Sequence, residues 1–250
     1  MSIVLFVLAF LSGSSLGSFA NVVIDRVPLR KSLIRPGSHC DSCGAALTSM
    51  DLVPVFSYLA LRGRCRRCGA KVPLRVLLVE VLFGLGAAAV VLSYGLNSSG
   101  LFVYVSGAIL LVLTVIDIEQ GIVPHEIVIP ATAVALVAAF FYPPLGWKSG
   151  LLGGAIAFGV LLLPAVLRPG GMGWGDVKLA PFLGIIVGFP SVLVSLFTAF
   201  IAGGLIGVIV MLAGKGTRKS SVPFVPFLAM GTMVGLIWGQ AAVRWYLRLF

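Results

Sequence analysis

The sequence predicts an all-α polytopic membrane protein with about eight transmembrane helices and a small zinc-binding cytoplasmic insertion. Of the 250 residues, 59% are hydrophobic and only 10% are charged, whereas about a quarter of the residues in an ordinary soluble domain are charged. The apolar residues form long runs, and the four cysteines fall within one polar segment between two of these runs. Lipid is therefore the expected solvent for most of the chain.

Eight apolar runs approach the length of about 20 residues that a helix needs to cross the hydrocarbon core. The shortest, 179–189, needs Val177 and Lys178 at its start, with the lysine side chain reaching the membrane interface. A secretory signal would have a basic residue before its apolar run. The first run has none, so we expect it to remain as a transmembrane helix. The runs are 2–24, 74–94, 101–115, 127–142, 150–167, 179–189, 192–213 and 224–243.

Positive charge is sorted by loop. The net charge is +10, but the basic residues form no stripe with interleaved aromatic residues, so we expect no nucleic-acid partner. If the first helix runs from outside to inside, only Lys148, Arg244 and Arg248 of the 18 lysines and arginines fall outside the cytoplasm. This pattern agrees with the positive-inside rule and predicts that the long loop is cytoplasmic. The two terminal arginines leave the topology of the last run open.

Two pairs of cysteines with matching spacing lie in this loop, Cys40-x2-Cys43 and Cys65-x2-Cys68. The spacing is typical of four-thiolate zinc sites. The loop has few apolar residues for a core, so a metal ion or another cross-link is needed to stabilise a folded structure. We expect a structural zinc ion whose four thiolate ligands leave no position for water. A pair of disulfides and redox-active thiols are the alternatives.

Two of the eight acidic residues, Asp117 and Asp176, lie at the ends of apolar runs. A carboxylate at membrane depth costs roughly 2.5 to 3.5 kcal/mol on insertion scales, so such positions need a reason. Two spanning runs separate these aspartates, which places both on the same membrane face in either orientation. Neighbouring carboxylates share a proton, so one can act as a base toward water and the other as an acid toward a carbonyl. The pair predicts an aspartic peptidase, and interfacial carboxylates at helix ends are the alternative.

The residues around Asp176 support this interpretation. Gly173 and Gly175 remove side chains next to it, so an extended substrate backbone has room to approach, and Lys178 follows at the interface. Because Asp176 lies near a helix N-terminus, where the helix dipole favours an anion, we expect Asp117 to be the more often protonated of the two.

Motifs along nearly the whole chain point to one family. The sequence reads GSFANVVIDRVP at 17–28, SHCDSC at 38–43, DLVPVFSY at 51–58, LRGRCRRC at 61–68 and GWGDVKL at 173–179, with Glu80 after the cysteine loop. In these motifs the chain resembles the bacterial type IV prepilin peptidases, which are also N-methyltransferases. One departure is His125, which follows Pro124 where the family often has Asp or Asn.

The resemblance implies cleavage of the short basic leader of prepilins or pseudopilins at the cytoplasmic face of the bacterial inner membrane. It also implies methylation of the new N-terminus with S-adenosylmethionine, because the cysteine loop marks the bifunctional members. Asp51, Gly63 and Glu80 lie where the loop meets the membrane and are expected cofactor contacts; a turn glycine and helix-end carboxylates are the alternative. Since both the leader and this face are basic, we hypothesise that Glu119 or Glu126 receives the cations of the leader.

The sequence thus predicts three parts: the first transmembrane helix (1–24), the four-cysteine loop with the methyltransferase part (25–73), and a seven-helix peptidase domain (74–250). A peptidase without methyl transfer differs only in the loop. A proton-coupled or ion-coupled transporter would use intramembrane aspartates as well, but no matching pair of broken helices in two halves supports it. A zinc-bearing structural scaffold predicts that replacement of either aspartate is silent.

Overall fold

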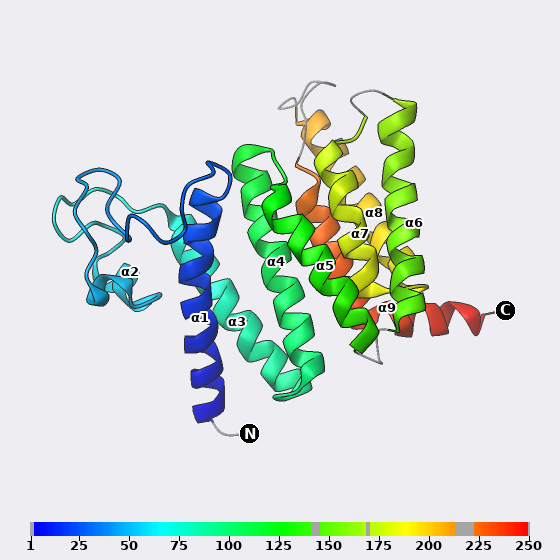
Figure 1. Cartoon of the computed structure of the whole chain (residues 1–250), viewed down its shortest axis with the longest axis horizontal. Helices are drawn as coiled ribbons and strands as arrows, with labels where there is room; N and C mark the ends of the chain where they lie inside the picture. The colour runs from blue at the N-terminus through cyan, green and yellow to red at the C-terminus, as the bar shows by residue number, and fades with distance from the viewer. Residues whose placement is uncertain (1–2, 142–145, 169–170, 214–222, 250) are drawn as a thin grey trace. The chain divides into compact units, whose positions relative to one another are not determined.

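Helices form almost all of the regular structure (Figure 1). The computed structural model describes residues 3–141, 146–168, 171–213 and 223–249. Among these residues the β-pairing consists of isolated bridges in the cysteine loop, so the predicted all-helical class is confirmed. The elements are α1 (Ile3–Arg26), η1 (Ser49–Leu52), α2 (Phe56–Ala60), α3 (Leu74–Tyr94), α4 (Ser98–Gln120), α5 (His125–Phe141), α6 (Trp147–Leu167), α7 (Trp174–Val187), α8 (Ser191–Leu212) and α9 (Val225–Leu247).

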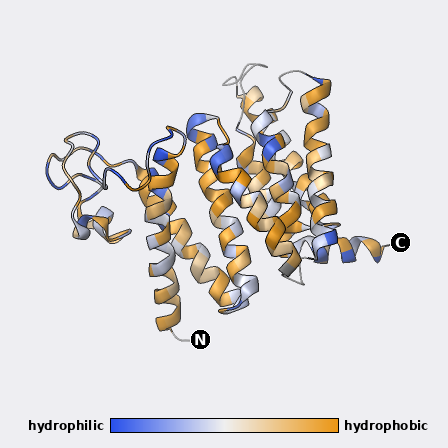
Figure 2. Cartoon of the chain, in the orientation of Figure 1, coloured by the Kyte–Doolittle hydropathy of each residue, from blue (hydrophilic) through white to orange (hydrophobic). Residues whose placement is uncertain are grey.

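Each of the eight predicted apolar runs lies almost wholly within a helix. The described residues of these runs that are not helical lie at the ends of three runs: Gly188, Phe189, Ala213 and Phe224. Ser2 and Tyr142, the predicted ends of two other runs, lie outside the described residues. Within those residues, six helices are long and apolar enough to cross a membrane: α1, α3, α4, α6, α8 and α9. The helices α5 and α7 are shorter, with 17 and 14 residues. Figure 2 shows the long helices to be hydrophobic over most of their length. The chain is therefore a multi-pass membrane protein.

The chain divides into two compact units, Met1–Ala108 and Ile109–Phe250, with the boundary inside α4. The four cysteines lie in the first unit and both aspartates of the expected pair lie in the second. The three-part functional division expected from the sequence stays a prediction.

In the first unit, α1 and α3 pack closely because glycines line their contact. A Cβ atom added to Gly13 would lie 2.6 Å from Cβ of Ala87, and one added to Gly17 would lie 2.8 Å from Cα of Glu80. Small residues spaced by four positions let two membrane helices approach in this way. At the polar end of the two helices, Arg75 of α3 forms an ion pair with Asp25 of α1 at 2.6 Å.

In the second unit, α7 is the central helix and packs against α5, α6, α8 and α9. Most of its residues from Asp176 to Ile186 are buried. Gly153 of α6 and Gly184 of α7 bring the two backbones together, since a Cβ on either glycine would run into the carbonyl oxygen of the other. Because other helices surround α7, protein and not lipid is the main neighbour of its apolar side chains. The helix therefore does not have to match the full thickness of the hydrocarbon core, and its short length is compatible with a membrane position.

Candidate active site and metal centre

Asp117 lies in the last turn of α4 and is only 6% exposed. Its Oδ2 accepts a hydrogen bond from the backbone N–H of Val225 at 3.1 Å. Val225 is the first residue of α9, and the preceding residue, Phe224, has no side-chain oxygen to cap this helix. The first N–H groups of a helix have no partner within it. The Asp117 carboxylate therefore provides a cap for a helix that begins 108 residues later in the chain.

Asp176 is the third residue of α7 and is 8% exposed. Its backbone N–H donates to the carbonyl oxygen of Gly173 at 3.1 Å, and its carboxylate accepts a hydrogen bond from the backbone N–H of Gly173. This return bond is the arrangement by which an acidic third residue stabilises the start of a helix. The apolar run predicted to begin at 179 thus starts earlier, at Trp174, because backbone capping and not hydropathy determines where the helix begins.

The structure brings the two carboxylates together. Asp117 and Asp176 are close enough for their charges to interact, and both belong to the second unit. Three helix ends meet at the pair: the C-terminus of α4 and the N-termini of α7 and α9. The two N-termini favour negative charge, while burial and mutual repulsion oppose two full charges. This arrangement suits a pair that shares one proton.

The glycines before Asp176 each have an internal neighbour. A Cβ added to Gly173 would lie 3.0 Å from Oδ2 of Asp176. A Cβ added to Gly175 would lie 2.8 Å from Cγ2 of Val123, in the segment between α4 and α5. Close packing of the protein on itself therefore explains Gly175, and the space for a substrate backbone that we expected from the sequence stays a prediction.

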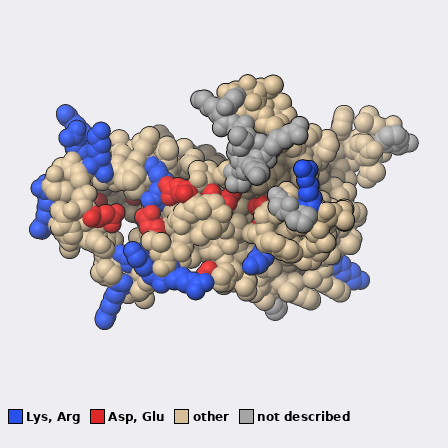
Figure 3. Space-filling model, turned by 90° about the horizontal axis from the view of Figure 1, so that it is seen from above, with Lys and Arg blue, Asp and Glu red and all other residues tan. Residues whose placement is uncertain are grey.

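The polar residues around the pair are at the surface. Lys178, Glu119 and Glu126 are all exposed, and Glu126 lies 3.4 Å from Nε2 of His125 at the start of α5. Figure 3 looks onto the helix ends drawn uppermost in Figure 1 and shows acidic side chains there together with lysines and arginines. The expected role of Glu119 or Glu126 in holding a basic leader stays a prediction.

The four cysteines of the first unit gather in one cluster. The sulfur atoms of Cys40, Cys43, Cys65 and Cys68 all lie within 4.8 Å of one another, and none of the four forms a disulfide. The Sγ atoms of Cys40 and Cys68 are 3.8 Å apart. Tetrahedral zinc with bonds of about 2.3 Å to sulfur requires sulfur atoms about 3.8 Å apart. The donor set and its spacing therefore fit a metal ion, as the sequence predicted.

The two cysteine pairs have the same local structure. In each, the backbone N–H of the first cysteine donates to the residue after the glycine, Cys40 to Ala45 at 2.9 Å and Cys65 to Ala70 at 2.8 Å. Each following glycine has a positive φ, which residues with a side chain rarely adopt. Backbone N–H groups of Cys68 and Arg67 hydrogen-bond to the sulfur of Cys65 and lower the pKa of its thiol to about 6. At Cys65 the turn itself thus favours the thiolate, the form that binds metal.

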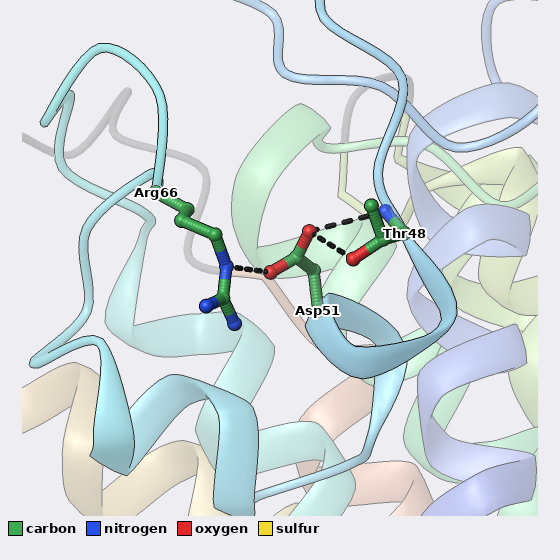
Figure 4. A network of polar contacts seen from close by, with 3 residues as sticks. All are labelled: Thr48, Asp51 and Arg66. Atoms are coloured by element: carbon green, nitrogen blue, oxygen red, sulfur yellow. Dashed lines mark hydrogen bonds and ion pairs between the residues drawn. The ribbon is translucent and has the colours of Figure 1, made fainter.

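Asp51 connects the segment before α2 to the second cysteine pair (Figure 4). Its Oδ2 accepts hydrogen bonds from the hydroxyl and the backbone N–H of Thr48, at 2.7 and 3.1 Å, and its Oδ1 accepts one from Nε of Arg66 at 2.7 Å. The Thr48 hydroxyl and then the Arg66 guanidinium lower the pKa of the Asp51 carboxyl to about 2. Asp51 is therefore an anion at any physiological pH.

The other two expected cofactor contacts also have internal neighbours. Glu80 is buried in α3, and its Oε2 accepts a hydrogen bond from the backbone N–H of Val55 at 2.7 Å. Gly63 has a φ of 66°, and a Cβ there would lie 2.8 Å from the hydroxyl of Tyr58. These contacts give Asp51, Gly63 and Glu80 structural roles in the loop, and their contact with a cofactor stays a prediction.

Sequence reasoning missed the partners of these residues. The Thr48-x-x-Asp51 spacing is a recognisable capping signature and was the one local signal available. The contacts of Asp117 with Val225 and of Gly175 with Val123 join segments far apart in the chain. No local sequence pattern predicts such contacts.

Two family models match the sequence. Residues 11–94, a range that includes all four cysteines, match the bacterial peptidase A24 N-terminal domain. Residues 103–208, a range that includes both aspartates, match the type IV leader peptidase family. No solved structure matches the chain.

Curated relatives match over nearly the full length. Proteins named prepilin leader peptidase/N-methyltransferase from Bacillus subtilis and Aeromonas salmonicida are 29% and 30% identical, covering 96% and 97% of this chain and 97% and 94% of their own. One of the same name from Myxococcus xanthus is 34% identical over 83% of this chain and 63% of its own. The chain therefore belongs to the bacterial type IV prepilin leader peptidase family.

Proposed function

We propose that the chain is an aspartic endopeptidase that removes the short basic leader of type IV prepilins or pseudopilins, with Asp117 and Asp176 as its catalytic pair. The observation that carries the proposal is the meeting of these two buried carboxylates, in electrostatic contact, at the N-termini of α7 and α9. Both lie within the segment that matches the leader peptidase family.

The chemistry needs one proton shared between the two carboxylates. The ionised member takes a proton from water, whose oxygen bonds to the carbonyl carbon, while the protonated member donates to the carbonyl oxygen. The carbon–nitrogen bond then breaks, the leaving amine takes a proton from the pair, and one hydroxyl of the tetrahedral intermediate returns a proton to the pair as the carboxyl group forms. One water molecule is consumed, one carboxyl and one amine are formed, and the pair returns to its starting state.

The distribution of charge supports a location for the reaction. The sorting of lysine and arginine by loop supports the cytoplasmic face of the bacterial inner membrane for both the pair and the cysteine loop. Exposed Glu119 and Glu126, at the end of α4 and the start of α5, supply negative charge on the two elements next to Asp117 and are proposed to receive the cations of the leader.

We further propose a structural zinc ion on the four cysteines and a second activity, N-methylation of the new N-terminus. The second activity is supported by the name of the relatives, which joins both functions. S-adenosylmethionine would supply an electrophilic methyl group to the new amine. A peptidase that lacks this step is the competing function.

The deciding experiment incubates the purified protein in lipid nanodiscs with a prepilin-like peptide and labelled S-adenosylmethionine, and measures cleavage and label separately. Cleavage is expected to be lost in Asp117→Asn and in Asp176→Asn, because each asparagine keeps a side-chain oxygen for the N–H of Val225 or Gly173 but cannot take up a proton. The matched control is Asp41→Asn, an exposed acid in the cysteine loop, which should cleave normally. Full cleavage by either test variant would refute the pair, and cleavage without label would leave only the peptidase.

A further inference from the structure

One contact places the cysteine loop deeper than its polar composition suggests. The backbone N–H of Val55, just before α2, is buried and donates to Oε2 of Glu80 at 2.7 Å. Glu80 is six residues beyond Leu74, the first residue of α3, which is about 9 Å along the helix axis. The hydroxyl of Ser18 in α1 also hydrogen-bonds to Glu80. The chain at Val55 therefore reaches down beside α1 and α3, past their polar ends.

The polar end of these helices is marked independently. Arg75 pairs with Asp25 at 2.6 Å, and the amide of Asn21 donates to the carbonyl oxygen of Val76 at 3.1 Å. The headgroup region of one leaflet is only about 5 to 8 Å thick. If the Arg75–Asp25 pair lies among the headgroups, Glu80 and Val55 lie near the border of the hydrocarbon. Figure 1 agrees, because α2 lies at a level between the two ends of α1 and not beyond them.

The surface at this depth is apolar. Met50 of η1 is 71% exposed, and Phe56 and Leu59 of α2 are 58% and 59% exposed, with exposed Leu52 and Val53 between them. Exposed apolar side chains gathered in one short segment mark an interaction surface. Tyr58, by contrast, turns inward and donates its hydroxyl to the carbonyl oxygen of Val72 at 3.2 Å, so α2 is held to the loop by one side and presents phenylalanine and leucine on the other.

Positive charge borders this apolar segment. Arg62 and Arg64 follow α2 directly and are exposed, as are Arg66 and Arg67. Figure 3 shows lysine and arginine side chains projecting from the loop at the left of the view. Apolar side chains flanked by arginines are the composition of a segment that lies in the interface of an anionic membrane.

We propose that residues 50–59 are embedded in the lipid interface, with Met50, Phe56 and Leu59 among the upper acyl chains and the following arginines among anionic headgroups. The metal-bearing loop is then anchored flat on the membrane and does not extend freely into the cytoplasm. The proposal does not depend on the peptidase activity, because it concerns only the first unit and the lipid around it.

The test uses the full chain with its metal in nanodiscs made of phosphatidylglycerol and phosphatidylcholine. Phe56→Trp adds an indole at the proposed depth, and its emission is taken as the difference from the wild-type protein, which carries four tryptophans. When the phosphatidylcholine is replaced by a form brominated on its acyl chains, most of this added emission is expected to be lost. Asp41→Trp, an exposed position in the first cysteine pair, serves as the control and should keep its emission, provided that its metal content is unchanged.

Equal emission from Phe56→Trp in both kinds of disc would overturn the proposal. If brominated lipid has no effect but a prepilin-like peptide shifts the emission to shorter wavelength, the surface binds protein, and the lipid proposal is wrong. Should Phe56→Trp fail to fold, Met50→Trp makes the same measurement from η1, where the side chain makes few contacts with the rest of the loop.

Discussion

The carboxylate of Asp117, at the end of α4, accepts a hydrogen bond from the backbone N–H of Val225, at the start of α9. Removal of this acceptor should destabilise the second unit apart from any effect on chemistry. We expect Asp117→Ala to lower the free energy of unfolding by about 1 kcal/mol, as loss of a helix cap does, and Asp117→Asn to lower it less. Thermal unfolding followed by circular dichroism in mild detergent measures both. Identical stability of the two variants would show that the cap contributes nothing.

Gly175 should be replaceable only if Val123 is made smaller. A Cβ at position 175 would lie 2.8 and 2.9 Å from two carbons of the Val123 side chain, and such overpacking costs about 1 to 3 kcal/mol. Gly175→Ala is therefore expected to unfold at a lower temperature, and Val123→Ala in the same chain is expected to restore most of the loss.

The control for the Gly175 and Val123 variants is Gly159→Ala in α6, because a Cβ added there has no neighbour within 4 Å. This variant should be as stable as the wild type or slightly more so, since alanine favours helix. A double variant no more stable than Gly175→Ala alone would mean that contact with Val123 is not what requires glycine.

All four cysteines should be needed for zinc binding. Because tetrahedral zinc needs all four thiolates to close its shell, Cys43→Ser and Cys68→Ser are each expected to lose most of the bound zinc and to make the loop 27–73 sensitive to protease. Ser42→Ala, between the cysteines of the first pair, should retain both metal and protection. Stoichiometric zinc in either serine variant, measured by elemental analysis, would argue against the four-thiolate site.

The bond of Asp51 to Arg66 should be insensitive to pH in the neutral range. The folded-state pKa of Asp51 is about 2, below the ordinary value of 3.8, so the stabilisation is fully present above the ordinary value and is lost only as the pH falls through about 2. We expect Asp51→Asn to increase protease cleavage of the loop equally at about pH 6 and about pH 8.

Thr48 and Arg66 share this carboxylate, so their removal should have graded effects. Arg66→Gln leaves the Thr48 contacts in place and is expected to increase cleavage less than Asp51→Ala does, while Arg67→Gln serves as the matched control. An effect of Arg67→Gln as large as that of Arg66→Gln would point to general loss of positive charge and not to the specific pair.

Hydropathy and spacing predicted the features that depend on local composition. The eight apolar runs, the four-thiolate cluster and the shared location of Asp117 and Asp176 all followed from the order of residues along the chain. Apolar runs in a membrane protein have to be helical because no water is present to satisfy the backbone. The parity of the two intervening runs was enough to put both aspartates on one face.

Hydropathy cannot distinguish lipid from protein as the neighbour of an apolar side chain. For this reason the sequence did not show that the run at 179–189 belongs to a helix, α7, that begins at Trp174 and packs against other helices. Composition likewise marked 25–73 as a polar cytoplasmic loop and gave no indication that Val55 is buried against Glu80. Contacts over 25 or 108 residues are set by packing, which no window along the sequence contains.

The contact between Val55 and Glu80 also bears on how the protein is made. Val55 leaves the ribosome before Glu80 does, and its N–H has no permanent acceptor until α3 has been synthesised and has entered the membrane beside α1. The loop between α1 and α3 can therefore reach its final structure only after both of these helices are inserted in the membrane. During biosynthesis, the cysteine-bearing segment is thus translated before α3 but depends on α3 for this contact.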